Sequence, residues 1–458
     1  MGERLVVIGG DAAGMSAASQ ARRRRGSEDL EIIAFERGNH TSYSACGIPY
    51  WIGGLVDEPV DLVARTPDQH RARDIDVRTG HTVTGIDLEK RRVSVQPPFG
   101  DEETHRYDQL MIATGGQPVR PDWPGIDGKG VHGVQTLDDG EAIGASLRQG
   151  REGKAAKRAV VIGAGYIGVE MAEALMRKGL DVTLVERGAE PMHTLDADMG
   201  ALVGTALRKM GVDVRTGVSV QALELDADGW VRSVVTDAGE FAADVVVLGL
   251  GTRPSIQLAE AAGVPIGAAG GIVTDRRMRV PGHEGVWAAG DCVEVVHRVT
   301  GRTVAVPLGT HANKQGRVAG INLGGGYATF PGVVGTAVSK VCDLEIARTG
   351  LREDEAEAAG FAAVTATIES NTQAGYYPGA DTVTVKLLAE RGSGLLLGGQ
   401  LVGGDGTAKR IDVLAVALWN RMTVDEMTGL DLGYAPPFSP VWDPVLVAAR
   451  AASDAVHV

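Results

Sequence analysis

The sequence predicts an α/β fold in which two units along the chain each begin with an apolar strand, a glycine-rich turn and a helix. The first unit starts at Leu5 and the second at Ala159. Short, wholly apolar runs such as these are typical of buried parallel strands. A third observation is a cysteine, Cys46, which lies in the segment Thr41–Tyr50 soon after the first unit's second strand. The chain has 458 residues, enough for about three domains.

The composition excludes several classes of protein. Hydrophobic residues make up 44% and charged residues 23% of the chain, which is ordinary for a globular protein. A net charge of −14 argues against a nucleic-acid partner, because no broad basic face is available to neutralise phosphates. No apolar run approaches the roughly 18 residues that span a bilayer, and the first strand leaves no room for a signal peptide. We therefore expect a cytoplasmic protein with no membrane partner.

Three cysteines, Cys46, Cys292 and Cys342, are too few and too far apart for a disulfide framework or a zinc site. They suit a reducing compartment, and no metal site is expected. Cys292 follows a Gly-Asp pair and Cys342 stands between Val341 and Asp343, and both are interpreted as structural. Cys46 is therefore the cysteine for which a chemical role is sought.

The first glycine-rich turn follows the strand Leu5–Ile8. Gly9 allows a tight turn, and Gly14 lets strand and helix pack closely, with the helix expected over Met15–Arg25. A pyrophosphate can lie at the N-terminus of such a helix. Asp11 takes the place of the usual middle glycine, which weakens the match to a dinucleotide fingerprint.

Later segments return to the same unit. The strand Leu30–Phe35 ends at Glu36, where a carboxylate can bind ribose hydroxyls. Another strand ends in a small-residue turn, and a third leads into Gly290 and Asp291, whose carboxylate can accept a hydrogen bond from a ribityl hydroxyl or cap a helix. A unit that begins near residue 1 and finishes near residue 325 implies a second domain inserted in its middle. The candidate binding residues of this first site are Gly9, Gly14, Glu36, Thr114, Gly115 and Asp291.

The second glycine-rich turn is a complete G-x-G-x-x-G with a strand, Ala159–Ile162, before it and a helix, Val169–Lys178, after it. That context makes the motif specific for a dinucleotide. The next strand ends at Glu186, where a carboxylate accepts the 2′-hydroxyl of NAD and repels the 2′-phosphate of NADP. Arg187 is adjacent and can soften that preference, so NADH is the expected donor with NADPH left open. Glu170 is a candidate for orienting the nicotinamide. The candidate residues of this site are Gly163, Gly165, Gly168 and Glu186.

Taken together, these segments resemble the single-cysteine flavoprotein disulfide reductases, which include coenzyme A-disulfide reductases, persulfide reductases, and NADH oxidases and peroxidases. The resemblance covers the whole chain. It implies bound FAD, NADH or NADPH as electron donor, and a C-terminal domain that builds a homodimer. The segments that carry it are Gly9–Gly14, Ser42-Tyr43-x-x-Cys46-Gly47, Ala113–Gly116, Gly163–Gly168, Gly251–Pro254, Gly290-Asp291 and Tyr434-Ala-Pro-Pro-Phe-Ser-Pro440.

The implied architecture is glutathione-reductase-like, with two Rossmann-like dinucleotide-binding domains and an α+β C-terminal dimerisation domain. The FAD-binding domain is expected to be discontinuous. The expected limits are 1–118 with 247–328 for the FAD-binding domain, 119–246 for the NAD(P)H-binding domain and 329–458 for the dimerisation domain.

In the family the cysteine lies against the flavin and cycles between a thiolate and oxidised forms, which the resemblance carries over to Cys46. The residues from Gly47 onward can start a helix, and a thiol at a helix N-terminus has its thiolate stabilised. Thr41 stands five residues before Cys46, where two-cysteine reductases have their second cysteine. The chain therefore cannot form that internal disulfide, and the second sulfur or oxygen atom must come from the substrate.

The resemblance leaves more than one activity open. The peroxidase branch carries a histidine where Ala12 stands, so peroxidase is disfavoured. The main prediction is reduction of a coenzyme A disulfide, a persulfide or a related low-molecular-weight disulfide. The alternatives are an NADH oxidase that reduces O2, because reduced flavin can react with oxygen, and a flavin-based redox sensor.

Several residues match positions that touch substrate in the coenzyme A reductases. Tyr434 and one of Tyr376 or Tyr377 match tyrosines that the partner subunit delivers to the sulfur site, where a phenol can protonate the leaving thiolate. Three departures stand at Ala45, where those reductases have asparagine, and at Trp442 and near Asp74, where they have lysine. The candidate substrate-binding residues are Ser16, Gln20, Arg23 and Ser42.

Overall fold

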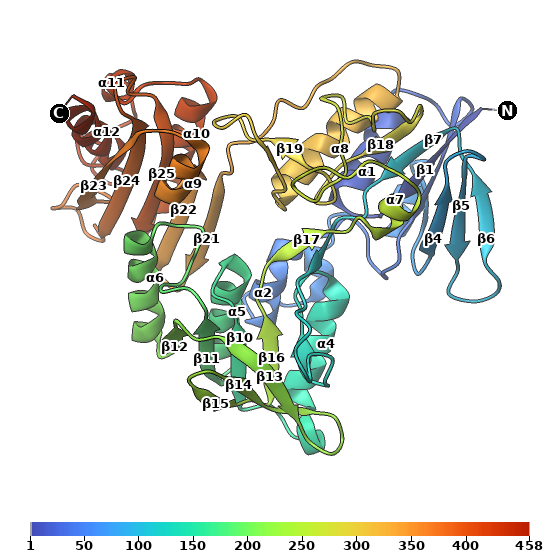
Figure 1. Cartoon of the computed structure of the whole chain (residues 1–458), viewed down its shortest axis with the longest axis horizontal. Helices are drawn as coiled ribbons and strands as arrows, with labels where there is room; N and C mark the ends of the chain where they lie inside the picture. The colour runs from blue at the N-terminus through green and yellow to red at the C-terminus, as the bar shows by residue number, and fades with distance from the viewer. Residues whose placement is uncertain (1, 458) are drawn as a thin grey trace.

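The computed structural model describes residues 2–457, which form several sheets wrapped by helices (Figure 1). The first sheet is parallel, in the order β18-β7-β1-β2-β3, and the chain returns to it late, at β18. Helices α1 and α8 pack against each other over this sheet. The bounds are β1 Glu3–Ile8, β2 Leu30–Phe35, β3 Asp76–Arg78, β7 Gln109–Ile112, β18 Val286–Ala288, α1 Ala12–Arg22 and α8 Gly309–Leu323.

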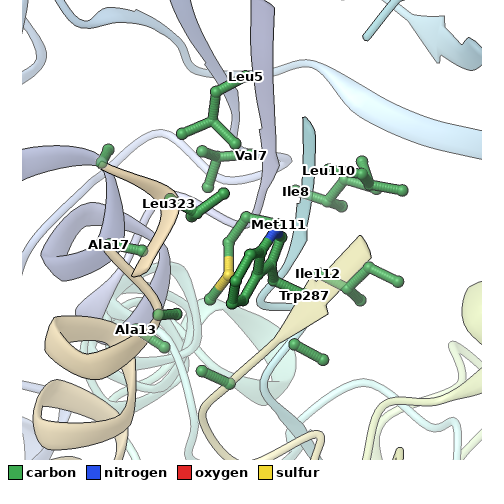
Figure 2. Close-up of a cluster of buried hydrophobic side chains, with 14 of the residues drawn as sticks. Leu5, Val7, Ile8, Ala13, Ala17, Leu110, Met111, Ile112, Trp287 and Leu323 are labelled. Atoms are coloured by element: carbon green, nitrogen blue, oxygen red, sulfur yellow. The ribbon is translucent and has the colours of Figure 1, made fainter. Parts of the chain in front are cut away.

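The core of this first sheet is built from segments that are distant in sequence. Figure 2 shows Met111 of β7 and Trp287 of β18 beside side chains of β1, α1 and α8. Trp287 also donates a hydrogen bond of 2.9 Å from Nε1 to Gln109 Oε1, which satisfies its buried polar atom. The glycine turn after β1 is therefore supported by a rigid, dry layer.

Both helices that follow glycine turns begin earlier than the sequence predicts. Helix α1 begins at Ala12 instead of Met15, and it ends at Arg22 instead of Arg25. Helix α5, Tyr166–Arg177, begins three residues before the expected Val169. The reason is that the last residues of each glycine turn already adopt helical geometry. The backbone amides at the helix N-terminus therefore stand directly at the turn.

A second parallel sheet has the order β12-β11-β10-β16-β9, and α5 and α6 pack with α4 around it. A three-stranded antiparallel sheet, β13-β14-β15, lies beside it. The bounds are β9 Val131–His132, β10 Arg158–Ile162, β11 Asp181–Glu186, β12 Asp213–Thr216, β13 Val220–Leu225, β14 Val231–Thr236, β15 Gly239–Ala242, β16 Val245–Leu248, α4 Leu137–Arg148 and α6 Ala197–Met210.

The C-terminal part is an antiparallel sheet, β21-β22-β25-β24-β23, with α10 packed on β22 and β25 and α12 packed on β23 and β24. Figure 1 shows this part at one end of the molecule, with β21 reaching toward the second parallel sheet. The bounds are β21 Ala337–Val341, β22 Leu344–Gly350, β23 Ala363–Asn371, β24 Thr382–Glu390, β25 Leu396–Gly403, α10 Thr407–Trp419 and α12 Pro444–Val456.

Two contacts tie these parts together. Val341 and Ile346 of the β21–β22 hairpin are fully buried in the same apolar cluster as Ala172 of α5. Helix α2, which follows Cys46, packs on α5 as well. The remaining elements are α2 Ile48–Ile52, α3 Pro67–Arg71, α7 Gln257–Ala261, α9 Glu353–Ala359, α11 Val424–Thr428, β4 Thr82–Asp87, β5 Arg92–Gln96, β6 Glu103–Arg106, β8 Gly116–Pro118, β17 Thr252–Pro254, β19 Val295–Val296 and β20 Thr303–Val304. Among residues 2–457, no helix is long and apolar enough to cross a membrane.

Candidate active site

The first glycine turn is shaped by close backbone contacts. Gly9 has a φ of +106°, and a Cβ there would lie 2.1 Å from the Ala113 carbonyl oxygen. A Cβ on Gly14 would lie 2.0 Å from the Gly9 carbonyl oxygen. The expected reasons for both glycines, a tight turn and close helix packing, are therefore visible in the structure.

Glu36 closes the other side of this turn. Its Oε2 accepts a hydrogen bond of 2.7 Å from the Gly10 amide, and its Oε1 accepts one of 2.7 Å from the Gly38 amide. A cavity of about 520 Å³ opens beside Glu36 and is also lined by Tyr43 and Asp138. That volume is in the range of small-ligand sites.

Thr114 and Gly115 follow β7, which pairs with β1, and Asp291 follows β18, which pairs with β7. Thr114 Oγ1 donates to the Ser255 carbonyl oxygen at 2.6 Å, and the Ser255 amide donates to the Gly115 carbonyl oxygen at 2.9 Å. Asp291 follows β18, and among residues 2–457 no side chain or amide donates a hydrogen bond to its carboxylate. Burial raises the pKa of Asp291 to about 6. A half-buried acceptor that no described protein group satisfies fits a ligand hydroxyl.

The second glycine turn repeats the geometry of the first. A Cβ on Gly168 would lie 1.9 Å from the Gly163 carbonyl oxygen, and Gly165 is the N-cap residue of α5. Glu186 Oε2 accepts from the Ala164 amide at 2.8 Å, and its Oε1 accepts from the Gly188 amide at 2.7 Å. Each turn thus has a carboxylate fixed at its mouth.

Cys46 lies in a single 3-10 turn, Ala45–Gly47, just before α2, and it is exposed. The expectation of a thiolate stabilised by a helix N-terminus is wrong for the protein groups alone. Partial removal from water, then the carboxylates of Glu170 and Asp291, raise the pKa of the Cys46 thiol. The physical reason is that burial and the charges of these carboxyl groups outweigh the dipole of α2, which spans only five residues.

These carboxyl groups come from three distant segments. Burial raises the pKa of Glu170, on α5, to about 7, although Ser339 Oγ donates to its Oε1 at 2.7 Å. Burial also raises the pKa of Asp11 to about 7, against a hydrogen bond from the Tyr43 amide. In the sequence, Asp11 stands out only as a departure from a motif. An acid in a turn that normally needs glycine was the signal that could have identified it.

Because the pKa of Glu170 is raised, we expect its contribution to the stability of the folded protein to depend on pH. Its pKa rises from an ordinary 4.5 to about 7, so the ionised form is disfavoured in the folded protein. Stability of the FAD-free protein should therefore fall as pH rises between these values. Glu170→Gln should raise the midpoint of thermal unfolding at about pH 8 and leave it unchanged near pH 4.

The matched control for this prediction is Glu89→Gln, which removes an exposed carboxyl from the loop between β4 and β5. This control should change the midpoint of thermal unfolding only slightly, and by the same amount at both pH values. Parallel pH profiles for wild type and Glu170→Gln would show that the folded protein does not disfavour the Glu170 carboxylate.

The candidate substrate residues lie on α1 and beside Cys46. Ser16 Oγ donates a hydrogen bond of 2.9 Å to Oδ1 of Asn313, which lies on α8. Gln20 Oε1 accepts from Arg24 Nη1 at 3.0 Å. Ser42 has a φ of +51°, and its hydroxyl lies 2.9 Å from His70 Nε2. Arg23 is exposed just after the end of α1.

Sequence reasoning missed a cationic group that joins Arg23. Burial and the charges of Arg73 and Arg23 lower the pKa of Arg65, and burial with Arg65 and Arg73 lowers the pKa of His70 to about 4. Among residues 2–457, none of these three arginines forms an ion pair with a carboxylate. We call Arg23, Arg65 and Arg73 the arginine cluster. The signal available was their shared charge, but they are spread over fifty residues of chain and only the fold brings them together.

The three candidate tyrosines lie on the C-terminal part and are exposed, Tyr376 by 78%, Tyr377 by 38% and Tyr434 by 49%. Tyr434 stands close to Tyr376, which contributes to the raised pKa of its phenol. Their two loops are joined by a hydrogen bond of 3.0 Å from the Ala374 amide to the Pro436 carbonyl oxygen. The tyrosines thus stand on different elements from those that surround Cys46 in one subunit.

Two glycine turns, each with a carboxylate at its mouth, are typical of an oxidoreductase that binds two dinucleotides. Comparison with known families makes the class definite. Residues 3–316 match the family described as pyridine nucleotide-disulphide oxidoreductase, and residues 336–444 match its dimerisation domain. The chain belongs to the pyridine nucleotide-disulphide oxidoreductase family.

Individual relatives extend this result over nearly the whole chain. An NAD(P)H coenzyme A polysulfide/persulfide reductase of Pyrococcus horikoshii is 39% identical over 98% of each chain. An NADH oxidase of Methanocaldococcus jannaschii is 35% identical, again over 98% of each chain. The solved structure of an NAD-dependent persulfide reductase from A. fulgidus is 42% identical, covers 98% of this chain and 83% of that one, and superposes with a TM-score of 0.94.

The family uses FAD with NAD(P)H, and the residues of this chain fit both. The cavity beside Glu36 has room for the adenosine end of FAD. The carboxylate of Asp291, which accepts no hydrogen bond from the described residues, suits a hydroxyl of the ribityl chain. The turn at Gly9–Gly14 would hold the pyrophosphate at the N-terminus of α1.

Proposed function

We propose that the protein reduces a coenzyme A disulfide, a coenzyme A persulfide or a related low-molecular-weight disulfide with NAD(P)H, through FAD and Cys46. The observation that carries this proposal is that Cys46 is the exposed cysteine among residues 2–457 and has no cysteine beside it. Thr41 is fully buried where a second cysteine would stand, and its hydroxyl donates to the Gly10 carbonyl oxygen. Cys292 is fully buried as well. The second sulfur must therefore belong to the substrate.

The reaction with a disulfide RS–SR then has two halves. The Cys46 thiolate attacks one sulfur, a Cys46–SR bond forms, and the second RS⁻ leaves and takes a proton. Two electrons next break the Cys46–SR bond, which releases the remaining RS⁻ and restores the thiolate. Overall one NAD(P)H and one proton convert one disulfide to two thiols. When bound, FAD supplies the two-electron chemistry that links the nicotinamide to sulfur.

The acids around Cys46 have a role in moving protons. Glu170 and Asp11 each have a pKa of about 7, so each can be found protonated or ionised at neutral pH. They can hold the proton that the thiol gives up and return one to a departing thiolate. The negative charge of an ionised acid near the sulfur would also disfavour formation of the Cys46 thiolate. Proton transfer from the thiol and attack of the thiolate on the disulfide should therefore be coupled.

The arginine cluster supports an anionic substrate such as coenzyme A. Among residues 2–457 these three guanidinium groups have no carboxylate partner, so their positive charge is available to an anion. Arg65 and Arg73 supply cations near Asp74, where the coenzyme A reductases have lysine. Ser42 and His70 connect this cluster to the segment that carries Cys46. Phosphates bind guanidinium groups through paired hydrogen bonds.

The proposal includes a homodimer formed through the C-terminal part, 329–458, with the FAD-binding part at 1–118 and 247–328 and the NAD(P)H-binding part at 119–246. Phe438, Val441 and Trp442 are exposed by 75%, 71% and 50% in one subunit. Exposed apolar side chains gathered on one segment are typical of a surface that a partner covers. The match to a dimerisation domain over residues 336–444 includes all three of these side chains.

The test is an anaerobic titration of the FAD-loaded protein with NADH, followed by coenzyme A disulfide. The flavin absorbance should fall with NADH and return with the disulfide, and free thiol should appear at two per disulfide consumed. A flavin that stays reduced until oxygen enters would support the alternative of an NADH oxidase. Reduction by NADH with no turnover of any disulfide or of oxygen would support a flavin-based redox sensor.

Glu186 should determine the choice between NADH and NADPH. Its carboxylate is held by the Ala164 and Gly188 amides at the end of β11, where a 2′-phosphate would be repelled. Glu186→Ala should lower kcat/KM for NADH by roughly tenfold and raise it for NADPH, because Arg187 then meets the 2′-phosphate without a competing acid. Steady-state kinetics with both donors measure this. An unchanged ratio would place the determinant elsewhere.

A further inference from the structure

Three polar side chains form a row across the C-terminal sheet. Arg348 on β22 is the cross-strand partner of Gln400 on β25, and Gln400 is the cross-strand partner of Lys386 on β24. Directly opposed residues point to the same face, so the three side chains lie side by side. Lys386 and Gln400 are 4% and 3% exposed, and the side chain of Arg348 is 13% exposed. We call Arg348, Gln400 and Lys386 the brace.

The brace holds one segment of the second nucleotide unit, residues 194–198, which runs from the end of the β11–α6 loop into the first turn of α6. Lys386 Nζ lies 3.1 Å from Asp196 Oδ2 and 2.9 Å from Asp198 Oδ1. Gln400 donates from Nε2 to Asp196 Oδ2 at 2.7 Å and accepts from the Asp196 amide at 2.8 Å. Arg348 Nη1 donates to the Thr194 carbonyl oxygen at 2.8 Å. Each brace residue therefore contacts the segment directly.

The same segment continues to the second glycine turn. The Leu195 amide donates to the Met192 carbonyl oxygen at 2.7 Å, and the Met192 amide donates to the Ala164 carbonyl oxygen at 2.8 Å. Met192 is fully buried and has a φ of +57°, a left-handed conformation that a side chain adopts only when its surroundings enforce it. The ring of His193 is the nearest group to the open side of Gly165, at 3.6 Å from the position of a Cβ. The brace and the turn are thus two ends of one short segment.

The charges at the brace explain why the segment depends on Lys386. Glu353, on α9, also lies 2.8 Å from Lys386 Nζ, and its amide donates to Asp196 Oδ1 at 3.1 Å. One ammonium group therefore stands among the carboxylates of Asp196, Asp198 and Glu353. Without that ammonium group the three acids would repel one another, and two of them, Asp196 and Asp198, belong to the segment 194–198.

We propose that Lys386 is a positioning residue for the coenzyme, because it holds residues 194–198 so that the turn Gly163–Gly168 keeps the shape that binds NAD(H). This inference rests on the proposed function, in which that turn binds the coenzyme. It adds that the dimerisation part sets the affinity of the NAD(H) site. A turn that must first be ordered binds its ligand more weakly, whereas the chemical step at Cys46 is unaffected once the coenzyme is bound.

The experiment compares NAD⁺ binding by FAD-loaded wild type and Lys386→Met with isothermal titration calorimetry. NAD⁺ is used because it occupies the site without reducing the flavin. Lys386→Met should raise Kd for NAD⁺ by roughly tenfold, and in turnover it should raise KM for NADH while kcat and the KM for the disulfide stay near wild type. Lys386→Arg keeps the charge and should restore most of the affinity.

The matched control is Lys409→Met, which removes an exposed lysine paired with Asp412 on α10 of the same part. It should leave Kd for NAD⁺ unchanged. Gln400→Met is a second variant, which keeps Lys386 and removes two hydrogen bonds to Asp196, and it should raise Kd in the same direction but less. It keeps the test decisive if Lys386→Met does not fold.

The outcomes separate this inference from the proposed function. If wild type binds NAD⁺ and both Lys386→Met and Gln400→Met bind it equally well, the brace is only structural and the inference is wrong. A fall in kcat at saturating NADH with an unchanged KM would overturn it too. If wild type itself does not bind NAD⁺ or accept electrons from NADH, the proposed function fails before the brace is tested.

Discussion

Replacement of Cys46 by serine should abolish disulfide turnover and leave the two dinucleotide sites intact. A serine hydroxyl is a far weaker nucleophile toward sulfur than a thiolate and cannot form the Cys46–SR bond, so turnover should fall by at least about 10³-fold. Glu36 and Glu186 are held by backbone amides of their own turns and not by Cys46, so this substitution leaves them in place. The variant should therefore be purified with FAD, and anaerobic NADH should still reduce it.

The measurement follows thiol release from coenzyme A disulfide together with the flavin spectrum. Cys342→Ser is the matched control, because Cys342 is a second thiol that is not fully buried, on the hairpin between β21 and β22, and it should keep wild-type turnover. Turnover that survives in Cys46→Ser would show that the disulfide is reduced without a protein thiol. Loss of flavin reduction in that variant would instead show that Cys46 supports the coenzyme sites.

The parts of the fold that sequence reasoning could predict are those with local signals. Each glycine turn must bring a helix against a strand, and the acids Glu36 and Glu186 follow at spacings that a short strand–helix–strand unit imposes. Both acids are found with their oxygens bound to the turn amides. The helix starts were predicted too late, because residues after the second glycine were read as turn although they already have helical geometry.

The surroundings of Cys46 could not be predicted in the same way. Asp11 follows β1, Glu170 lies on α5 and Asp291 follows β18, so their approach to the sulfur depends on how the parts of the chain are packed. The direction of the pKa shift of Cys46 depends on that approach. The short helix after the cysteine, which is all that the sequence shows, therefore could not predict this direction. The arginine cluster and the brace depend on tertiary packing for the same reason.

The tyrosines provide the second test with a large expected effect. Arg410, whose side chain is 10% exposed, pairs with Asp443 at 3.1 Å and donates to the carbonyl oxygens of Thr372 and Phe438 at 2.6 and 2.7 Å. It thereby holds together the two loops that carry Tyr376 and Tyr434. If a partner subunit uses these phenols at its sulfur site, replacing both by phenylalanine should lower kcat by roughly 10²-fold or more.

A mixed dimer separates action within one subunit from action across the interface. One subunit carries Cys46→Ser, and the other carries Tyr376→Phe with Tyr434→Phe, each with a different purification tag. Both parent homodimers should be nearly inactive. If the tyrosines serve the partner's cysteine, the mixed dimer has one complete site and should show about half the wild-type rate per dimer. If they serve their own subunit's cysteine, neither site is complete and the mixed dimer should be as inactive as its parents.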